Sequence, residues 1–179
     1  MARIPYPDRP ADAVARLPVA LNAFRMLSHA PDLTGPVIDL GFAILGQTQL
    51  PTAIRELVIM TVAARTRCRY ESVQHTPIAL AAGVTPEQLA VIGELRPCVP
   101  PEFTEAEAAA LSAAVRITVE RTLEPGELDA LRRHFTDRET VEIIMTAGYY
   151  AMLAGLMNAL DVDIDPSGER FLNVDPRAT

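Results

Sequence analysis

Residues 52–88 read TAIRELVIMTVAARTRCRYESVQHTPIALAAGVTPEQ, and this stretch decides the fold that the sequence predicts. Apolar residues recur in it at i, i+3 and i+4, which is the spacing of an amphipathic helix and not of a strand. The arginine-rich turn 65–69 separates two such segments. We therefore expect a helical hairpin with one helix over 52–64 and a second over 70–82.

Capping residues mark the helix boundaries. We expect Thr52 to be the N-cap of the first hairpin helix and Gly83 to end the second. A Thr followed three residues later by Glu or Gln is the pattern of a capping box, in which each side chain binds the other residue's backbone N–H. The pattern occurs at Thr85, Thr104 and Thr136. These sites predict three further helix starts, and the last one opens a long apolar helix.

The same helical spacing recurs outside the hairpin, so the predicted fold class is all-α. Towards the N-terminus we expect one helix over 11–27, perturbed near Pro18, and another over 37–47. We expect residues 1–179 to form a single domain, with 1–10 as an N-terminal arm and 161–179 as a polar tail.

The composition narrows the class of function. The chain has 179 residues, 16 basic against 23 acidic side chains, and 49% hydrophobic residues. A chain of this length buries roughly 70% of its unfolded surface, so it needs no metal or disulfide to hold a core. The acidic balance without a basic run argues against binding to nucleic acid or to anionic membranes. All the basic residues are arginines, and without lysine the side chains cannot form a Schiff base.

The two cysteines and the N-terminus predict a cytoplasmic location. Prolines and charges occupy the start of the chain, where a signal peptide would have an apolar core. Cys68 and Cys98 have no disulfide spacing, so we expect both thiols to be reduced. The uninterrupted apolar stretches are far shorter than the roughly 20 residues of a membrane span, so we expect no segment that crosses a bilayer.

A degenerate internal repeat is one interpretation of two similar segments. Residues 55–58 read RELV and residues 138–141 read RETV, and the spacing from Glu56 to His75 equals that from Glu139 to Asn158. The alternative is that Glu139 only completes its capping box.

The predicted hairpin carries the densest group of reactive side chains: Glu56, Cys68, Tyr70, Glu71 and His75. Cys68, Glu71 and His75 follow i, i+3, i+7 and so share one face of a helix. If that face is buried, the protonation of Glu71 and His75 is coupled, with Glu56 orienting the ring or relaying the proton. Two alternatives remain open at this point: an exposed i, i+4 pair worth about 0.2–0.5 kcal/mol, and a metal site of Glu56, Glu71 and His75.

The order of these motifs resembles the carboxymuconolactone decarboxylase and alkylhydroperoxidase-D-like family. The resemblance is carried by Arg55-Glu56-Leu57, Cys68-Arg69-Tyr70-Glu71, His75 and Gly83-Val84. It implies an all-helical fold with a central helical hairpin and a homo-oligomer, often a trimer or hexamer. It also implies that there is no metal or organic cofactor.

The active site of this family has two forms. Peroxidase members have C-x-x-C with a reactive thiol at the position of Glu71, whereas decarboxylase members have a glutamate there and a histidine at the position of His75. The chain keeps only the first thiol, Cys68, and a peroxidase that cycles through a disulfide needs a second one. The resemblance is therefore closer to the decarboxylases.

These observations predict a cofactor-independent lyase or isomerase that acts on a small carbonyl or lactone acid. His75 is the expected general acid/base, with Glu71 sharing its proton and Glu56 as relay partner, and Tyr70 and Cys68 are the expected substrate-binding residues. Two alternatives stay open. One is a thiol peroxidase in which Arg67, Arg69 and protonated His75 lower the pKa of Cys68, and the other is a non-catalytic oligomeric binding protein. We expect a homo-oligomer, most simply a trimer.

Overall fold

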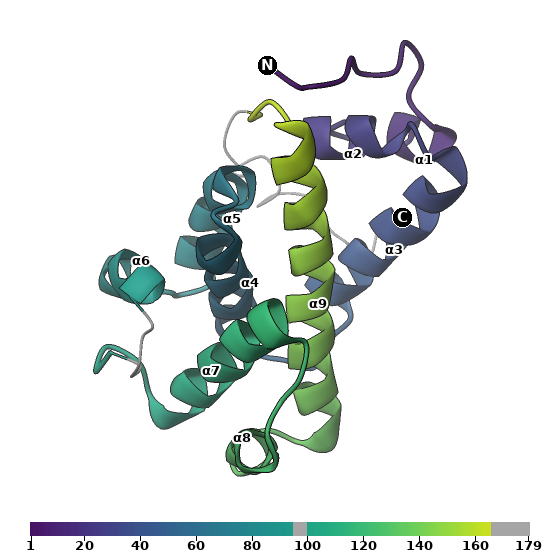
Figure 1. Cartoon of the computed structure of the whole chain (residues 1–179). Helices are drawn as coiled ribbons and strands as arrows, with labels where there is room; N and C mark the ends of the chain where they lie inside the picture. Colours follow the sequence, from purple (N-terminus) through teal and green to yellow (C-terminus); the bar gives the residue numbers. More distant parts are fainter. Residues whose placement is uncertain (95–99, 166–179) are drawn as a thin grey trace.

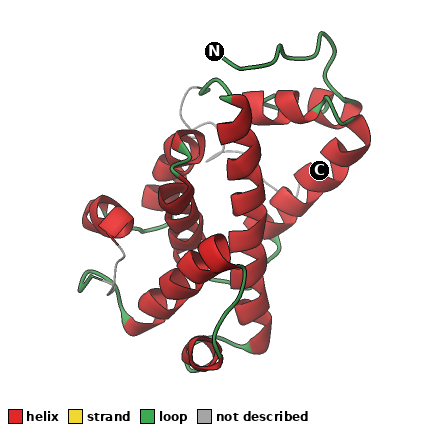
Figure 2. Ribbon diagram, viewed as in Figure 1, coloured by secondary structure: helices red, strands yellow, loops and turns green. Residues whose placement is uncertain are grey.

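The computed structural model describes residues 1–94 and 100–165, and every regular element within these ranges is a helix (Figures 1 and 2). The predicted all-α class is therefore confirmed. In chain order the helices are α1 (Asp12–Ala15), α2 (Asn22–Leu27), α3 (Pro31–Gly46), α4 (Thr52–Thr66), α5 (Arg69–Ala81), α6 (Pro86–Val91), the short 3-10 helix η1 (Ile92–Glu94), α7 (Glu105–Glu120), α8 (Pro125–Arg132) and α9 (Asp137–Leu160).

Helix α4 lies at the centre of the fold. Every residue from Ile54 to Ala63 is buried, as expected of a helix that neighbours enclose on all sides. It packs most extensively against α9, α7 and α5, and Figure 1 shows α9 running the length of the molecule beside it. The core contains this helix, and the other elements are arranged around it.

The turn after α4 forms the predicted hairpin. Arg67 adopts the left-handed conformation (φ 54°), and the backbone N–H of Cys68 donates to the carbonyl of Ala63 at 2.9 Å. This is the bond of a Schellman motif, which ends a helix and reverses the chain. Helix α5 consequently folds back on α4 and packs along it (Figure 1).

The predicted helix signals are confirmed where they are local. Thr85, Thr104 and Thr136 each form a complete capping box, and Gly83 follows α5 with φ 97°. The prediction for Thr52 is wrong. Pro51 is the N-cap, and no side chain caps the helix, so Thr52 is the first helical residue.

The structure also differs from the prediction in its N-terminal helices and at α8. The single helix expected over 11–27 is two short helices, α1 and α2, with a non-helical stretch around Pro18, because proline cannot donate a backbone hydrogen bond. Helix α3 begins at Pro31 and not at residue 37, and α8 was not predicted. Cys98 and most of the predicted polar tail lie outside the described residues.

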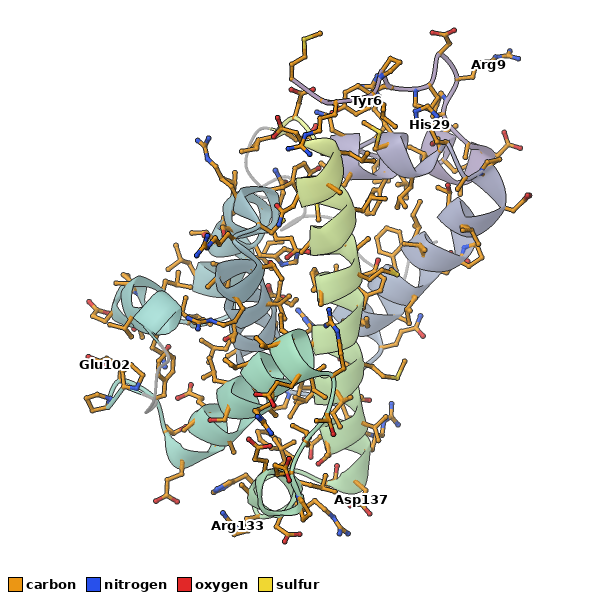
Figure 3. All side chains as sticks on the ribbon, viewed as in Figure 1. Tyr6, Arg9, His29, Glu102, Arg133 and Asp137 are labelled. Atoms are coloured by element: carbon orange, nitrogen blue, oxygen red, sulfur yellow. The ribbon has the colours of Figure 1, made fainter. Side chains whose placement is uncertain are left out.

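The N-terminal arm crosses the end of α9. The Tyr6 hydroxyl donates to Asp163 at 3.1 Å, and the backbone N–H of Arg3 donates to Leu160 at 2.8 Å. Figure 3 shows Tyr6 at this end of the molecule, close to His29, whose ring contacts the Pro5 carbonyl at 2.9 Å. By length and composition α9 is apolar enough to span a membrane, but half of its most apolar window is buried in the fold.

Candidate active site

Glu56 and His75 meet at the interface of α4 and α5. Glu56 is fully buried, and its Oε2 lies 2.9 Å from Nδ1 of His75. Arg55 donates from Nε and Nη2 to the other carboxylate oxygen, at 3.1 and 3.0 Å. Burial raises the pKa of Glu56, but the hydrogen bond and charge of His75 and the charge of Arg55 outweigh it, so the pKa lies below its usual value. The side chain is therefore held as a carboxylate.

This arrangement fixes the orientation of the His75 ring. An ionised Glu56 only accepts hydrogen bonds, so Nδ1 of His75 carries a proton, and in the neutral form of the ring the lone pair is on Nε2. Tyr150 packs edge-on against the ring, with the centroids 5.0 Å apart. Among the described residues no hydrogen bond reaches Nε2. The predicted role of Glu56 in orienting the ring matches this geometry.

Glu71 has the opposite environment. Its side chain is 2% exposed, and neither carboxyl oxygen has a hydrogen-bond partner among the described residues. Burial raises its pKa well above the usual value, which favours the neutral acid. The interpretation as an exposed helix pair is therefore wrong. The expected pairing with His75 is also corrected, because the carboxylate that contacts His75 is Glu56 from the neighbouring helix.

Glu71 and His75 line an apolar cavity of about 100 Å³. Its walls come from α2, α3, α5 and α9, whose side chains there are Ala23, Phe24, Ile38, Gly41, Phe42, Leu45, Tyr70, Glu71, Gln74, His75, Ile78, Tyr149, Tyr150, Leu153 and Met157. The Tyr149 hydroxyl donates to the Val37 carbonyl at 2.9 Å and lies where a Cβ on Gly41 would be. Gly41 therefore makes room for the ring that forms this wall.

The two residues expected to bind substrate have different positions. Tyr70 lines the cavity, but its hydroxyl donates to Asp165 at 2.5 Å and accepts from the backbone N–H of Ala23 at 3.2 Å. Cys68 is a fully buried free thiol and is not part of the cavity wall. Its pKa is raised to about 12, chiefly by burial. The expectation that nearby arginines lower it is wrong, because desolvation of the thiolate dominates.

Residues 31–116 match the profile of the carboxymuconolactone decarboxylase family. This range contains α3, α4 and α5 and therefore most of the site. This region, just under half of the chain, belongs to the carboxymuconolactone decarboxylase family. No curated protein matches the chain significantly.

Solved structures share the fold of this chain at low sequence identity. One is an uncharacterised peroxidase-related protein from Ralstonia eutropha JMP134 with an alkylhydroperoxidase core: 20% identity, 98% of this chain and 96% of that one, and a TM-score of 0.73. Another is a peroxidase-related protein from Silicibacter sp. TM1040, at 17% identity, 92% of both chains and a TM-score of 0.74. The debrominase Bmp8 matches at 22% identity, 93% of this chain and 83% of that one, with a TM-score of 0.64. These likenesses support the fold alone.

Several residues at the site were not among the site residues predicted from the sequence. Arg55, Gln74 and the pair Tyr149 and Tyr150 all contact the site or its cavity. Arg55 was detectable as the neighbour of a buried acid, whereas the tyrosines come from a helix more than 70 residues away. Among the described residues no group of three or more His, Cys, Asp or Glu side chains is placed to hold a metal ion, so Glu56, Glu71 and His75 do not form the metal site left open above.

Proposed function

We propose that the protein is a cofactor-independent lyase or isomerase that moves a proton at a carbon atom next to a carbonyl group. The observation that carries this proposal is a pair of buried glutamates, of which Glu56 contacts His75 and Glu71 lines the cavity with it. The pKa of Glu56 is lowered, whereas that of Glu71 is raised. Two carboxyl groups of one site whose pKa values are shifted in opposite directions are the usual basis for assigning an acid and a base.

The proposed reaction uses the free nitrogen of His75. Nε2 takes a proton from the carbon atom, and the ion pair of Glu56 and Arg55 stabilises the imidazolium that forms. Neutral Glu71 supplies a proton to the enolate, and a second transfer restores both groups. If the substrate instead loses carbon dioxide, the same enolate is left, and the same acid protonates it.

Thiol chemistry has less support from this geometry. A thiolate is the reactive form of cysteine, and a pKa of about 12 keeps the buried Cys68 protonated. A Cys68→Ser variant that retains full activity would exclude this alternative, and one that loses it would revive it.

Deuterium exchange tests the proposed function. Cyclic ketones and lactones, with and without a carboxyl group, are incubated with the protein in D₂O, and NMR follows exchange at the carbon next to the carbonyl and loss of carbon dioxide. We expect exchange or turnover with the wild type, and a loss of about 10²–10⁴-fold in His75→Gln. If no compound exchanges or turns over, the non-catalytic binding protein becomes the better interpretation.

A further inference from the structure

We propose that the cavity takes an uncharged ring with one hydrogen-bond acceptor, which Glu71 holds as the donor, and that it rejects carboxylate anions. This inference rests on the proposed function, because it names the substrate class of the same site. It favours isomerisation of a neutral ring carbonyl over decarboxylation of an acid.

The walls of the cavity fit a small flat molecule. Its lining is overwhelmingly apolar and includes five phenylalanine and tyrosine rings, those of Phe24, Phe42, Tyr70, Tyr149 and Tyr150. Its volume of about 100 Å³ is of the same order as a dry protein cavity of about 150 Å³ that binds benzene. A single ring is therefore the size of ligand that we expect the cavity to take.

Glu71 supplies the polar contact that orients such a ring. A neutral carboxyl has one O–H donor, and both of its oxygens are buried without a partner among the described residues. A buried polar group left unpaired is costly, and most such groups in proteins are paired. An acceptor oxygen on the ligand satisfies the Glu71 hydroxyl at the position where the cavity is otherwise apolar.

The charges around the cavity disfavour an anion. Among the described lining residues there is no arginine, and Arg55, which lies behind the wall, is engaged by Glu56 and by the Leu45 carbonyl at 2.7 Å. His75 is already paired with the Glu56 carboxylate. A ligand carboxylate would therefore be desolvated beside a single imidazole whose positive charge Glu56 already neutralises, which is unfavourable.

The interaction depends on the protonation of Glu71. The titratable groups near it are Cys68 and His75, from its own segment, and Tyr149 and Tyr150 from α9. Cys68, Tyr149 and Tyr150 are acids and carry no positive charge in either protonation state, and His75 is paired with Glu56. Ionised Glu71 has no hydrogen to donate, so we expect carbonyl binding to weaken as pH rises through its pKa.

Three probes of similar shape test the inference by calorimetry at mildly acidic pH: benzaldehyde, benzoate and toluene. The chain has no lysine, so the aldehyde forms no Schiff base with a side chain. We expect benzaldehyde to bind at least about tenfold more tightly than either of the others, which corresponds to about 1.4 kcal/mol. Equal or tighter binding of benzoate overturns the inference, and so does an absence of benzaldehyde binding.

Variants at Glu71 assign the preference to its donor. Glu71→Leu has an apolar side chain in an apolar site, and we expect it to bind benzaldehyde and toluene equally. Glu71→Gln keeps an N–H donor and should keep the preference, and Glu87→Gln on the exposed surface should not change it. A preference that survives in Glu71→Leu refutes the assignment to Glu71.

Benzaldehyde has no exchangeable proton next to its carbonyl, so this binding is independent of turnover. Binding without proton exchange on any ketone or lactone refutes the proposed function alone, and exchange confined to carboxylates refutes the substrate class alone.

Discussion

Glu56 and Glu71 have the same side chain and nearly the same burial, yet they differ in charge state. What differs is the set of neighbours. Glu56 accepts hydrogen bonds from Arg55 and His75, whereas Glu71 has no partner among the described residues. Burial alone favours the neutral form, and only a nearby cation reverses that preference. His75 and Arg55 together therefore divide the roles of the two acids.

Replacement of Arg55 tests this division. Because the folded pKa of Glu56 is lowered, its contribution to stability is present above the unfolded pKa of about 4.3 and is lost as pH falls through the folded pKa. Arg55→Met raises that folded pKa, so the acid loss of stability should begin at higher pH. We also expect the free energy of unfolding near neutral pH to fall by about 3–5 kcal/mol, since a buried charge loses a partner. Urea denaturation over a pH series measures both.

Arg138→Met is the matched control. Arg138 is 55% exposed and pairs with Glu142 on the surface of α9 at 2.9 Å, so its loss should cost less than about 1 kcal/mol. Arg55→Lys keeps the charge, so its loss of unfolding free energy should lie between those of Arg55→Met and Arg138→Met. It can be measured even if Arg55→Met does not fold. Equal effects of Arg55→Met and Arg138→Met would show that Arg55 does not hold Glu56.

Glu71→Gln should change stability in the opposite pH range. The folded pKa of Glu71 is raised, so the stability it contributes is complete below the unfolded pKa of about 4.3 and is lost as pH rises through the folded pKa. In that window the wild type loses about 1.4 kcal/mol per pH unit relative to a variant that does not titrate. The stability of Glu71→Gln relative to the wild type should therefore increase as pH rises. Parallel urea midpoints from about pH 4 to pH 8 would contradict a raised pKa.

At the scale of helices, the predictions from sequence succeed where the signal is local. The capping boxes at Thr85, Thr104 and Thr136 depend on residues three apart, and all three form. Helix α8 was missed because its cap is Glu124, which is not among the preferred N-cap residues, and because Gly126 lies in its first turn. The repeat remains a prediction, and the capping contact of Glu139 is present.

In the site too, what depends on local spacing could be predicted and what depends on tertiary contacts could not. Spacing along α5 places Glu71 and His75 on one face, and both do line the cavity. Spacing within one helix does not say which carboxylate contacts the ring, because Glu56 belongs to α4. The turn at Arg67 brings α4 and α5 together and so places Glu56 beside His75. The aromatic wall from α9 depends on tertiary packing in the same way.

Two glycines of α3 provide a test of the cavity wall. A Cβ at Gly41 would lie 2.5 Å from the Tyr149 hydroxyl, whereas one at Gly35 would meet only Ala13 at 3.8 Å. Gly41→Ala must therefore displace Tyr149, and we expect a loss of about 1–3 kcal/mol in unfolding free energy. Gly35→Ala should be neutral or stabilise by up to about 1 kcal/mol, as alanine does in a helix. Thermal and urea unfolding compare them, and similar values for the two variants would contradict the tight packing at Gly41.

At the scale of the whole molecule, α9 has two apolar faces. One packs into the core, and the other carries Val141, Met145 and Met152, each about half exposed. Gly148 lies between Met145 and Met152, and Gly155 follows Met152; at both positions a Cβ would meet nothing within 4 Å in the single chain. Glycine inside a helix is destabilising unless another backbone approaches closely. An outer stripe that has no charged residue and includes two such glycines fits a second copy of the chain.

We therefore predict that the protein is a homo-oligomer, with a trimer as the expected form, and that the outer stripe of α9 is buried in its interface. Light scattering at micromolar concentration should give about three times the chain mass of 19.4 kDa. Combining Met145→Glu with Met152→Glu places two charges on the stripe and should dissociate the assembly, because unpaired charges at an apolar interface are strongly unfavourable. Val119→Glu changes an equally exposed residue on α7 and is the control, which should leave the mass unchanged. A wild-type mass equal to one chain would refute the oligomer, and dissociation by the control alone would place the interface on α7.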